Sequence, residues 1–144
     1  MVDHWTRNGV APPLPGVDAA AIAAFERRFG VRLPADVRKY FLTTNGTGDF
    51  MDGAFFSFWP LQRVKPLHEM WMSVGPVRAA YPGCFVFADH SVRRCEFAVR
   101  LGDSPQRAGP VFRISESSNP SGEQVAPSFV DFMERYMEEP EVVL

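Results

Sequence analysis

The stretch FGVRLPADVRKYFLTTNG, residues 29–46, contains the signals that decide the local fold. Pro34 keeps the preceding leucine out of the helical region and suits the first position of a helix, so the Leu-Pro step predicts a helix start. Apolar residues then repeat at helical spacing. The Asn45-Gly46 pair predicts a left-handed stop. The stretch therefore indicates a helix over 35–44 between two breaks in the chain.

Two further helices are predicted, one before and one after this stretch. Upstream, Asp18 suits the N-cap of a helix over 18–29, which has apolar residues at helical spacing on an alanine-rich background. Downstream, SFVDFMERYM at 128–137 has the clearest helical spacing of apolar residues in the chain. Ser128 with Asp131 resembles a capping box at its start.

The remaining apolar runs are typical of strands, because they are short, rich in aromatic and β-branched residues, and bounded by turn residues. Strands are expected at 55–59, 84–89, 95–101 and 111–115. A short helix is expected over 66–74 and a long polar loop over 116–128. The residues thus predict two N-terminal helices, several strands and one C-terminal helix.

A chain of 144 residues with 46% hydrophobic residues is expected to form one globular domain. No apolar run approaches the roughly 18–20 residues of a membrane span, and the first residues lack the pattern of a secretory signal. We therefore expect a cytoplasmic protein with no membrane partner.

The cysteines, Cys84 and Cys95, are expected to be reduced, because two thiols in a chain without an export signal are typical of a reducing compartment. If 84–89 and 95–101 pair through a tight turn, Cys95 faces about residue 88. Cys84 then lies about 13 Å away. A disulfide requires a Cα separation below roughly 7 Å, so no bridge is predicted.

The formal net charge of −2 argues against nonspecific attraction to nucleic acid. The charge is unevenly distributed, since residues 1–115 carry a net +4 and residues 116–144 a net −6. Five arginines were considered as a nucleic-acid contact: Arg93, Arg94, Arg100, Arg107 and Arg113. They lack a pattern of stacking aromatic residues, so no nucleic-acid partner is predicted.

No metal or cofactor is predicted. The histidines at positions 4, 68 and 90 are isolated, and the sequence contains neither HExxH nor CxxC. The glycine-rich segment GTGDFMDG at 46–53 follows a helix and carries two aspartates, whereas a phosphate cradle follows a strand and attracts anions.

An enzyme was considered as an alternative, with Cys84 or Cys95 as nucleophile beside His90 and Asp89. Cys84 lies in an apolar strand, where thiols are usually inert. Asp89 and His90 are adjacent and point to opposite faces of a strand. We therefore expect no catalytic activity.

Phe50 and Met51 form a candidate binding site, because they are apolar, stand between Asp49 and Asp52, and lie in a turn expected to face solvent. Exposed apolar groups rimmed by charge often mark protein contacts. The alternative is that the two side chains anchor the loop to the core.

The segment 29–46 resembles the signature segment of the SUKH superfamily, which includes yeast cell-wall assembly regulators, the bacterial Syd protein and many bacterial immunity proteins. FWPL at 58–61, FVFAD at 85–89 and SFVDFMERYM at 128–137 are similar to later family segments. The resemblance covers about residues 17–138, which leaves 1–16 as an N-terminal extension and 139–144 as a C-terminal tail. It implies a single α+β domain with a mainly antiparallel sheet, flanked by two N-terminal helices and one C-terminal helix.

One segment departs from the family pattern. Family members often have a glycine-rich turn after the central strand, whereas HSVRRCEF at 90–97 contains no glycine. A four-residue turn of type I needs none, so we expect that turn here.

The resemblance implies a non-catalytic protein-binding module, typically an immunity protein that neutralises a cognate toxin, often a nuclease. The alternative is a regulatory or scaffolding module of the same fold with a host protein partner. Nucleases carry basic surfaces, so an inhibitor can use carboxylates and an apolar anchor. We predict these partner-binding residues: Asp49, Phe50, Met51, Asp52, Glu116 and Glu123.

Overall fold

The computed structural model describes residues 1–9, 12–70, 81–105, 109–115 and 123–144. The helices are α1 (Val2–Arg7), α2 (Ala19–Phe29), α3 (Ala35–Thr43) and α5 (Phe129–Glu138), with 3₁₀ turns η1 (Leu67–Glu69) and η2 (Pro140–Val143). The strands are β1 (Phe56–Phe58), β2 (Lys65–Pro66), β3 (Cys84–His90), β4 (Cys95–Arg100), β5 (Val111–Ile114) and β6 (Glu123–Ala126). The expected single α+β domain is confirmed.

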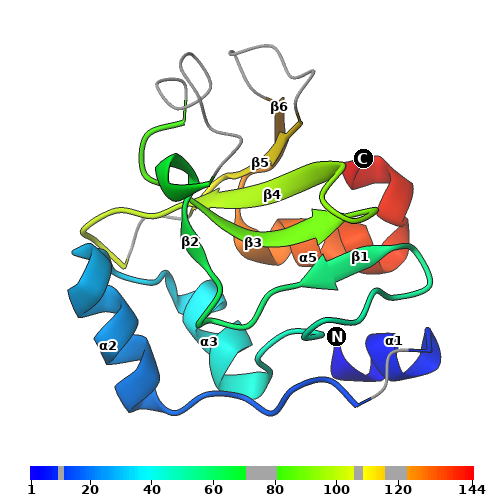
Figure 1. The fold of residues 1–144 in the computed structure, drawn as a ribbon, viewed down its shortest axis with the longest axis horizontal. Helices are drawn as coiled ribbons and strands as arrows, with labels where there is room; N and C mark the ends of the chain where they lie inside the picture. The colour runs from blue at the N-terminus through cyan, green and yellow to red at the C-terminus, as the bar shows by residue number, and fades with distance from the viewer. Residues whose placement is uncertain (10–11, 71–80, 106–108, 116–122) are drawn as a thin grey trace.

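The strands form one antiparallel sheet in the order β1-β3-β4-β5-β6, and β2 pairs with β3 beside β1. In Figure 1, α5 runs behind β3 and β4, and the first three helices lie below the sheet. The register places Phe56 opposite His90, so β1 begins where β3 ends. The loop that enters β1 and the turn that leaves β3 therefore meet at one end of the sheet.

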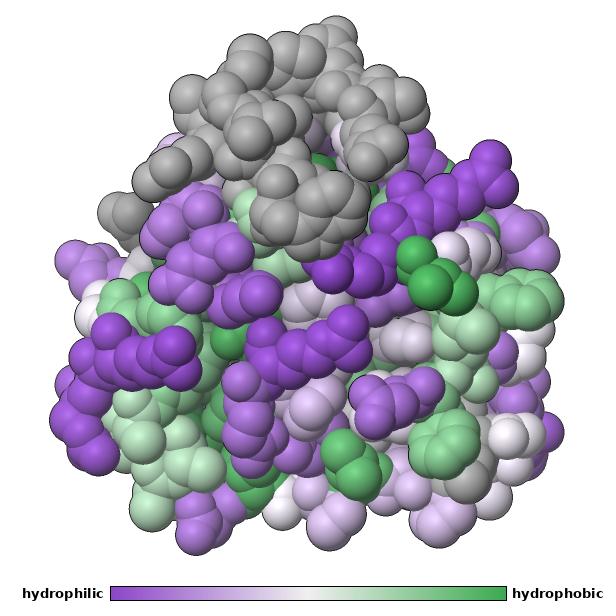
Figure 2. Space-filling view, viewed as in Figure 1, coloured by the Kyte–Doolittle hydropathy of each residue, from purple (hydrophilic) through white to green (hydrophobic). Residues whose placement is uncertain are grey.

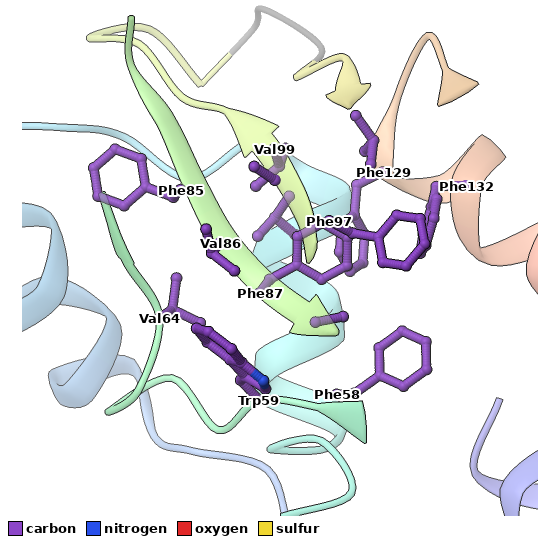
Figure 3. Close-up of a cluster of buried hydrophobic side chains, with 14 of the residues drawn as sticks. Phe58, Trp59, Val64, Phe85, Val86, Phe87, Phe97, Val99, Phe129 and Phe132 are labelled. Carbon is purple, nitrogen blue, oxygen red and sulfur yellow. The ribbon is translucent and has the colours of Figure 1, made fainter. Parts of the chain in front are cut away.

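The main core lies between α5 and the sheet, as Figure 3 shows. The ring centroid of Phe87 lies 5.1 Å from that of Phe129 and 5.4 Å from that of Phe132. The ring centroids of Phe97 and Phe132 lie 5.1 Å apart. The apolar spacing of α5 turns these side chains to one side of the helix. Ser128 caps the helix by accepting from the backbone N–H of Asp131, which confirms the predicted start.

The expected helices over 18–29 and 35–44 are present, and Asp18 caps α2 by accepting from the backbone N–H of Ala21 at 2.8 Å. The stop after α3 differs from the prediction, because the helix ends in an extended Thr44. Asn45 is buried and accepts from the backbone N–H of Leu61 at 2.7 Å. Gly46 has a φ of +83°, and a Cβ there would lie 2.3 Å from a backbone oxygen of β1.

Helical segments also occur at both ends of the chain, in the ranges assigned to an extension and a tail. Trp5 of α1 is fully buried, and its Nε1 donates to the hydroxyl of Tyr136 at 2.9 Å. Val143 of η2 is fully buried as well. Both ends of the chain therefore contribute side chains to the core.

The β3–β4 hairpin corrects the predicted register. Cys95 lies opposite His90 rather than residue 88, and Cys84 lies opposite Arg100. A bulge between Val86 and Ala88 shifts the pairing within the strand. The two thiols are free and lie at opposite ends of the hairpin, a separation that excludes a disulfide between them.

Two further predictions were wrong in part. The range 116–128 was expected to be a loop, yet Glu123–Ala126 pairs with β5 as an edge strand, and 116–122 lie outside the described residues. Instead of a helix over 66–74, the chain forms the two-residue strand β2 followed by η1. Residues 71–74 of that prediction also lie outside the described part. Pro66 has no backbone N–H to donate to β3, which limits the pairing of β2 at that point.

None of the helices in the described ranges has the length and apolar character needed to span a bilayer.

Candidate binding surface

Exposed apolar side chains occur on the loop before β1 and on the β3–β4 turn, which are joined at Phe55 and Ser91. Of the eight large hydrophobic side chains exposed in the described part of the chain, four lie there: Phe50, Met51, Phe55 and Val92. The exposed fraction reaches 58% for Phe55 and 77% for Val92. We call residues 50–55 and 91–94 the apolar turn pair. On the face drawn in Figure 2, hydrophobic side chains form separate patches among hydrophilic ones.

The backbone of the apolar turn pair is strained. The described non-glycine residues with positive φ are Phe55 at 65°, Ser91 at 51°, Val92 at 55° and Arg93 at 67°. This region costs an L-residue roughly 1–2 kcal/mol, and a β-branched or bulky side chain is an outlier there. The two turns are joined directly, because the N–H of Ser91 donates to the carbonyl of Phe55 at 3.0 Å. Within the described residues, the non-glycine residues with a strained backbone therefore all lie in these two joined turns.

Asp52 holds the first turn from inside. Its Oδ1 accepts from the backbone N–H groups of Ala54 and Phe56, both at 2.9 Å, and its backbone N–H donates to the carbonyl of Phe56 at 2.9 Å. The hydroxyl of Tyr136 donates to Oδ2. Asp52 is buried, so these charge-assisted bonds are shielded from water.

The same bonds connect the turn to three distant elements. Tyr136 belongs to α5 and also accepts from the indole of Trp5 in α1. Burial, followed by the neighbouring Asp52 carboxylate, raises the pKa of Tyr136, so the phenol stays a donor. The loop therefore presents Phe55 from a fixed backbone, and little ordering entropy remains to be lost on binding.

Asp89 and Arg93 hold the second turn. Asp89 Oδ1 accepts from the backbone N–H of Arg93 at 3.1 Å, and its Oδ2 accepts from the Trp59 indole at 2.6 Å. The Arg93 guanidinium donates to Glu96 at 2.9 and 3.0 Å. Burial raises the pKa of Glu96, and the bond from Arg93 opposes that rise. These contacts stabilise the left-handed turn although it contains no glycine.

This geometry corrects the predicted turn. The connection does contain four residues, 91–94, but three successive left-handed residues exclude type I, in which both central residues have negative φ. The absence of glycine in HSVRRCEF gives no local signal for a left-handed turn, so the sequence did not reveal it.

Among the predicted binding residues, Asp49, Phe50 and Met51 are exposed. Asp52 is different, because its carboxylate is committed to the loop and to Tyr136. Glu123 lies on β6, and its carboxylate forms an ion pair with Arg113. Glu116 lies outside the described residues. The structure joins Phe55 to the β3–β4 turn that carries Val92. Sequence reasoning did not single out either residue as a binding residue.

The sequence profile of the SMI1 / KNR4 family (SUKH-1) matches residues 16–135, most of the chain. The chain belongs to this family. No curated protein sequence matches it closely enough to add a relative.

The groups weighed for catalysis have other roles in this SUKH-1 domain. Cys84 is far along the hairpin from His90, whereas Cys95 is directly opposite it. Burial raises the pKa of the Cys95 thiol, and a nucleophilic cysteine needs the reverse shift. Asp89 binds Trp59 and the turn backbone through its two oxygens. The arrangement does not activate a thiol.

The arginines weighed for nucleic acid are largely engaged within the SUKH-1 domain. Arg93 pairs with Glu96, Arg113 pairs with Glu123, and Arg100 lies over the ring of Phe112. Arg94 is exposed, and Arg107 lies outside the described residues. Within the described ranges, no group of three or more histidine, cysteine or acidic side chains could hold a metal ion.

Proposed function

We propose that this SUKH-1 domain is an immunity protein that neutralises a protein toxin by binding it through the apolar turn pair. The observation that carries the proposal is that Phe55 and Val92 are both strained and exposed. Backbone strain persists where the surrounding structure enforces it and gathers at functional sites. Exposed apolar side chains on a preorganised backbone are the usual anchors of a protein interface.

Membership of SUKH-1 supports a binding role, since the family resemblance implies protein binding and, for many members, toxin immunity. The net charge of −6 over 116–144 supports a partner with a basic surface, such as a nuclease. Directly before the turn pair in the sequence, Asp49 supplies the exposed carboxylate of the predicted loop. Charge there would mainly raise the association rate, and the apolar anchors would slow dissociation.

The test uses the protein encoded beside this gene as the candidate toxin. Titration calorimetry compares Phe55→Ala/Val92→Ala with a matched control, Leu42→Ala/Val142→Ala, which removes exposed apolar groups elsewhere. We expect the first variant to bind at least about tenfold more weakly, because interface anchors cost more than 1 kcal/mol each. The control should bind like the parent protein.

A growth assay separates binding from immunity. Cells that produce the neighbouring protein should survive with the parent domain and with the control, but not with Phe55→Ala/Val92→Ala. Equal binding by both variants would show that the turn pair is not the interface. If the neighbouring protein binds but is harmless, the toxin role fails and the regulatory alternative takes its place.

A further inference from the structure

A second surface lies between α3 and α5, on elements other than the turn pair. A groove of about 280 Å³ runs between these helices. Its apolar lining comes mainly from Tyr40, Phe129, Met133, Met137 and Met1. Methionine side chains are flexible and polarisable, so a methionine-rich groove can adapt to different apolar side chains.

The groove exists because the rest of the fold covers only part of the apolar face of α5. Phe132 and Tyr136 turn inward and are fully buried. Val130 lines the groove and is 47% exposed, although it stands on a helix that otherwise separates apolar from charged residues. A valine left half in water beside a groove is apolar area that a partner can cover.

Among the charged side chains that line the groove, two are acidic, Asp36 and Glu134, and one is basic, Lys39. Asp36 is fixed there, because its Oδ2 accepts from the backbone N–H of Val130 at 3.0 Å. Glu138 follows Glu134 by one helical turn and lies beside it on the surface. Across the described residues, Glu134 and Glu138 take part in none of the ion pairs.

We propose that this groove binds a basic amphipathic segment of a partner protein. An apolar side chain of the segment would occupy the methionine-lined floor, and flanking lysine or arginine side chains would contact the carboxylates of Asp36, Glu134 and Glu138. The charge of the rim selects this occupant, because an acidic segment would place like charges against these carboxylates. The proposal goes beyond toxin binding by the turn pair and does not depend on it.

The probe is a labelled amphipathic peptide of about 18 residues, with leucine on one helical face and lysine on the other. A second peptide carries glutamate in place of every lysine. Fluorescence anisotropy measures the affinity of both peptides for the full chain. Backbone amide NMR shifts locate the bound peptide on the protein.

Two matched pairs of variants separate the groove from general charge attraction. Val130→Lys places a cation on the groove wall, and Val142→Lys makes the same change at an exposed valine of η2. Glu134→Gln/Glu138→Gln removes the rim charge. Its control, Glu139→Gln/Glu141→Gln, removes equal charge from exposed residues next along the chain.

We expect the lysine peptide to bind and to shift the amide resonances of α3 and α5. Its affinity for either groove variant should be at least about tenfold lower than for the parent protein. The controls should change the affinity by less than about twofold. The proposal is overturned if a groove variant and its control weaken binding equally, or if the shifts lie elsewhere. Binding of the glutamate peptide with equal affinity, or no binding of the lysine peptide, also overturns it.

Discussion

Replacing Val92 with glycine should stabilise the fold. Val92 has a φ of 55°, and a β-branched residue in this region costs on the order of 1–3 kcal/mol, which glycine avoids. Glycine costs about 0.5–1 kcal/mol of additional chain entropy on folding. Because the valine side chain is 77% exposed, its removal loses little packing. The balance is a gain of about 1 kcal/mol in the free energy of unfolding.

Urea denaturation measures this gain, with Val92→Ala as the control. Alanine also removes the exposed apolar group but retains a Cβ in the left-handed region, so its stability should lie below that of the glycine variant. A gain of about 1 kcal/mol corresponds to a midpoint of thermal unfolding about 4 °C higher in a domain of this size. Equal m-values would show that the unfolded states are comparable.

The reasoning is refuted if Val92→Gly is less stable than both the parent and Val92→Ala, since backbone strain would then contribute nothing. If the turn pair is the interface, the same substitution should weaken partner binding. Gains in stability that reduce function are typical of positions where a protein maintains a strained site.

Phe132→Ala should lower the free energy of unfolding by about 3–5 kcal/mol, because the ring is fully buried. Thermal melts measure this loss, and a midpoint lowered by only one or two degrees would contradict the packing of the ring. Asp52→Ala should cost about 3 kcal/mol, since it leaves buried donors unpaired, and a neutral result in urea denaturation would contradict the anchoring of the loop. Burial lowers the pKa of both His4 and His90 in the folded state. As the pH falls, the unfolded chain therefore takes up these protons at a higher pH than the folded chain does. The free energy of unfolding should fall as the pH drops below about 6.5. Urea denaturation at a series of pH values should show that His4→Gln/His90→Gln reduces this dependence, and an unchanged slope would refute the cause.

The helices could be predicted because their signals are local. Asp18 and Ser128 cap helices whose apolar residues repeat within a dozen positions, and both caps form as expected. The strand β6 could not be predicted in the same way. Its four residues, Glu123–Ala126, are stabilised by pairing with β5, a partner that local propensity does not reveal.

In the candidate site, too, features set by local sequence could be predicted, and features set by distant contacts could not. The exposure of Phe50 and Met51 follows from a glycine-rich segment between charged residues, and it is observed. The burial of Asp52 depends on Tyr136, which lies 84 positions away in the sequence. No local pattern distinguishes an aspartate that faces a partner from one that accepts from a distant tyrosine. A charge reversal at Asp52 would therefore perturb the fold, and interface tests belong on Phe55 and Val92.

Phe55 and Val92 each violate two local rules at once. A turn with positive φ favours glycine or asparagine, and a solvent-facing turn favours polar side chains. Packing does not explain Val92, because most of its surface is in water, and the domain would be more stable with glycine there. Residues that contradict local preference while their own side chains remain largely exposed are expected at functional sites. The missing compensation is supplied if a partner covers both side chains, which places the interface at the joined ends of β1 and β3.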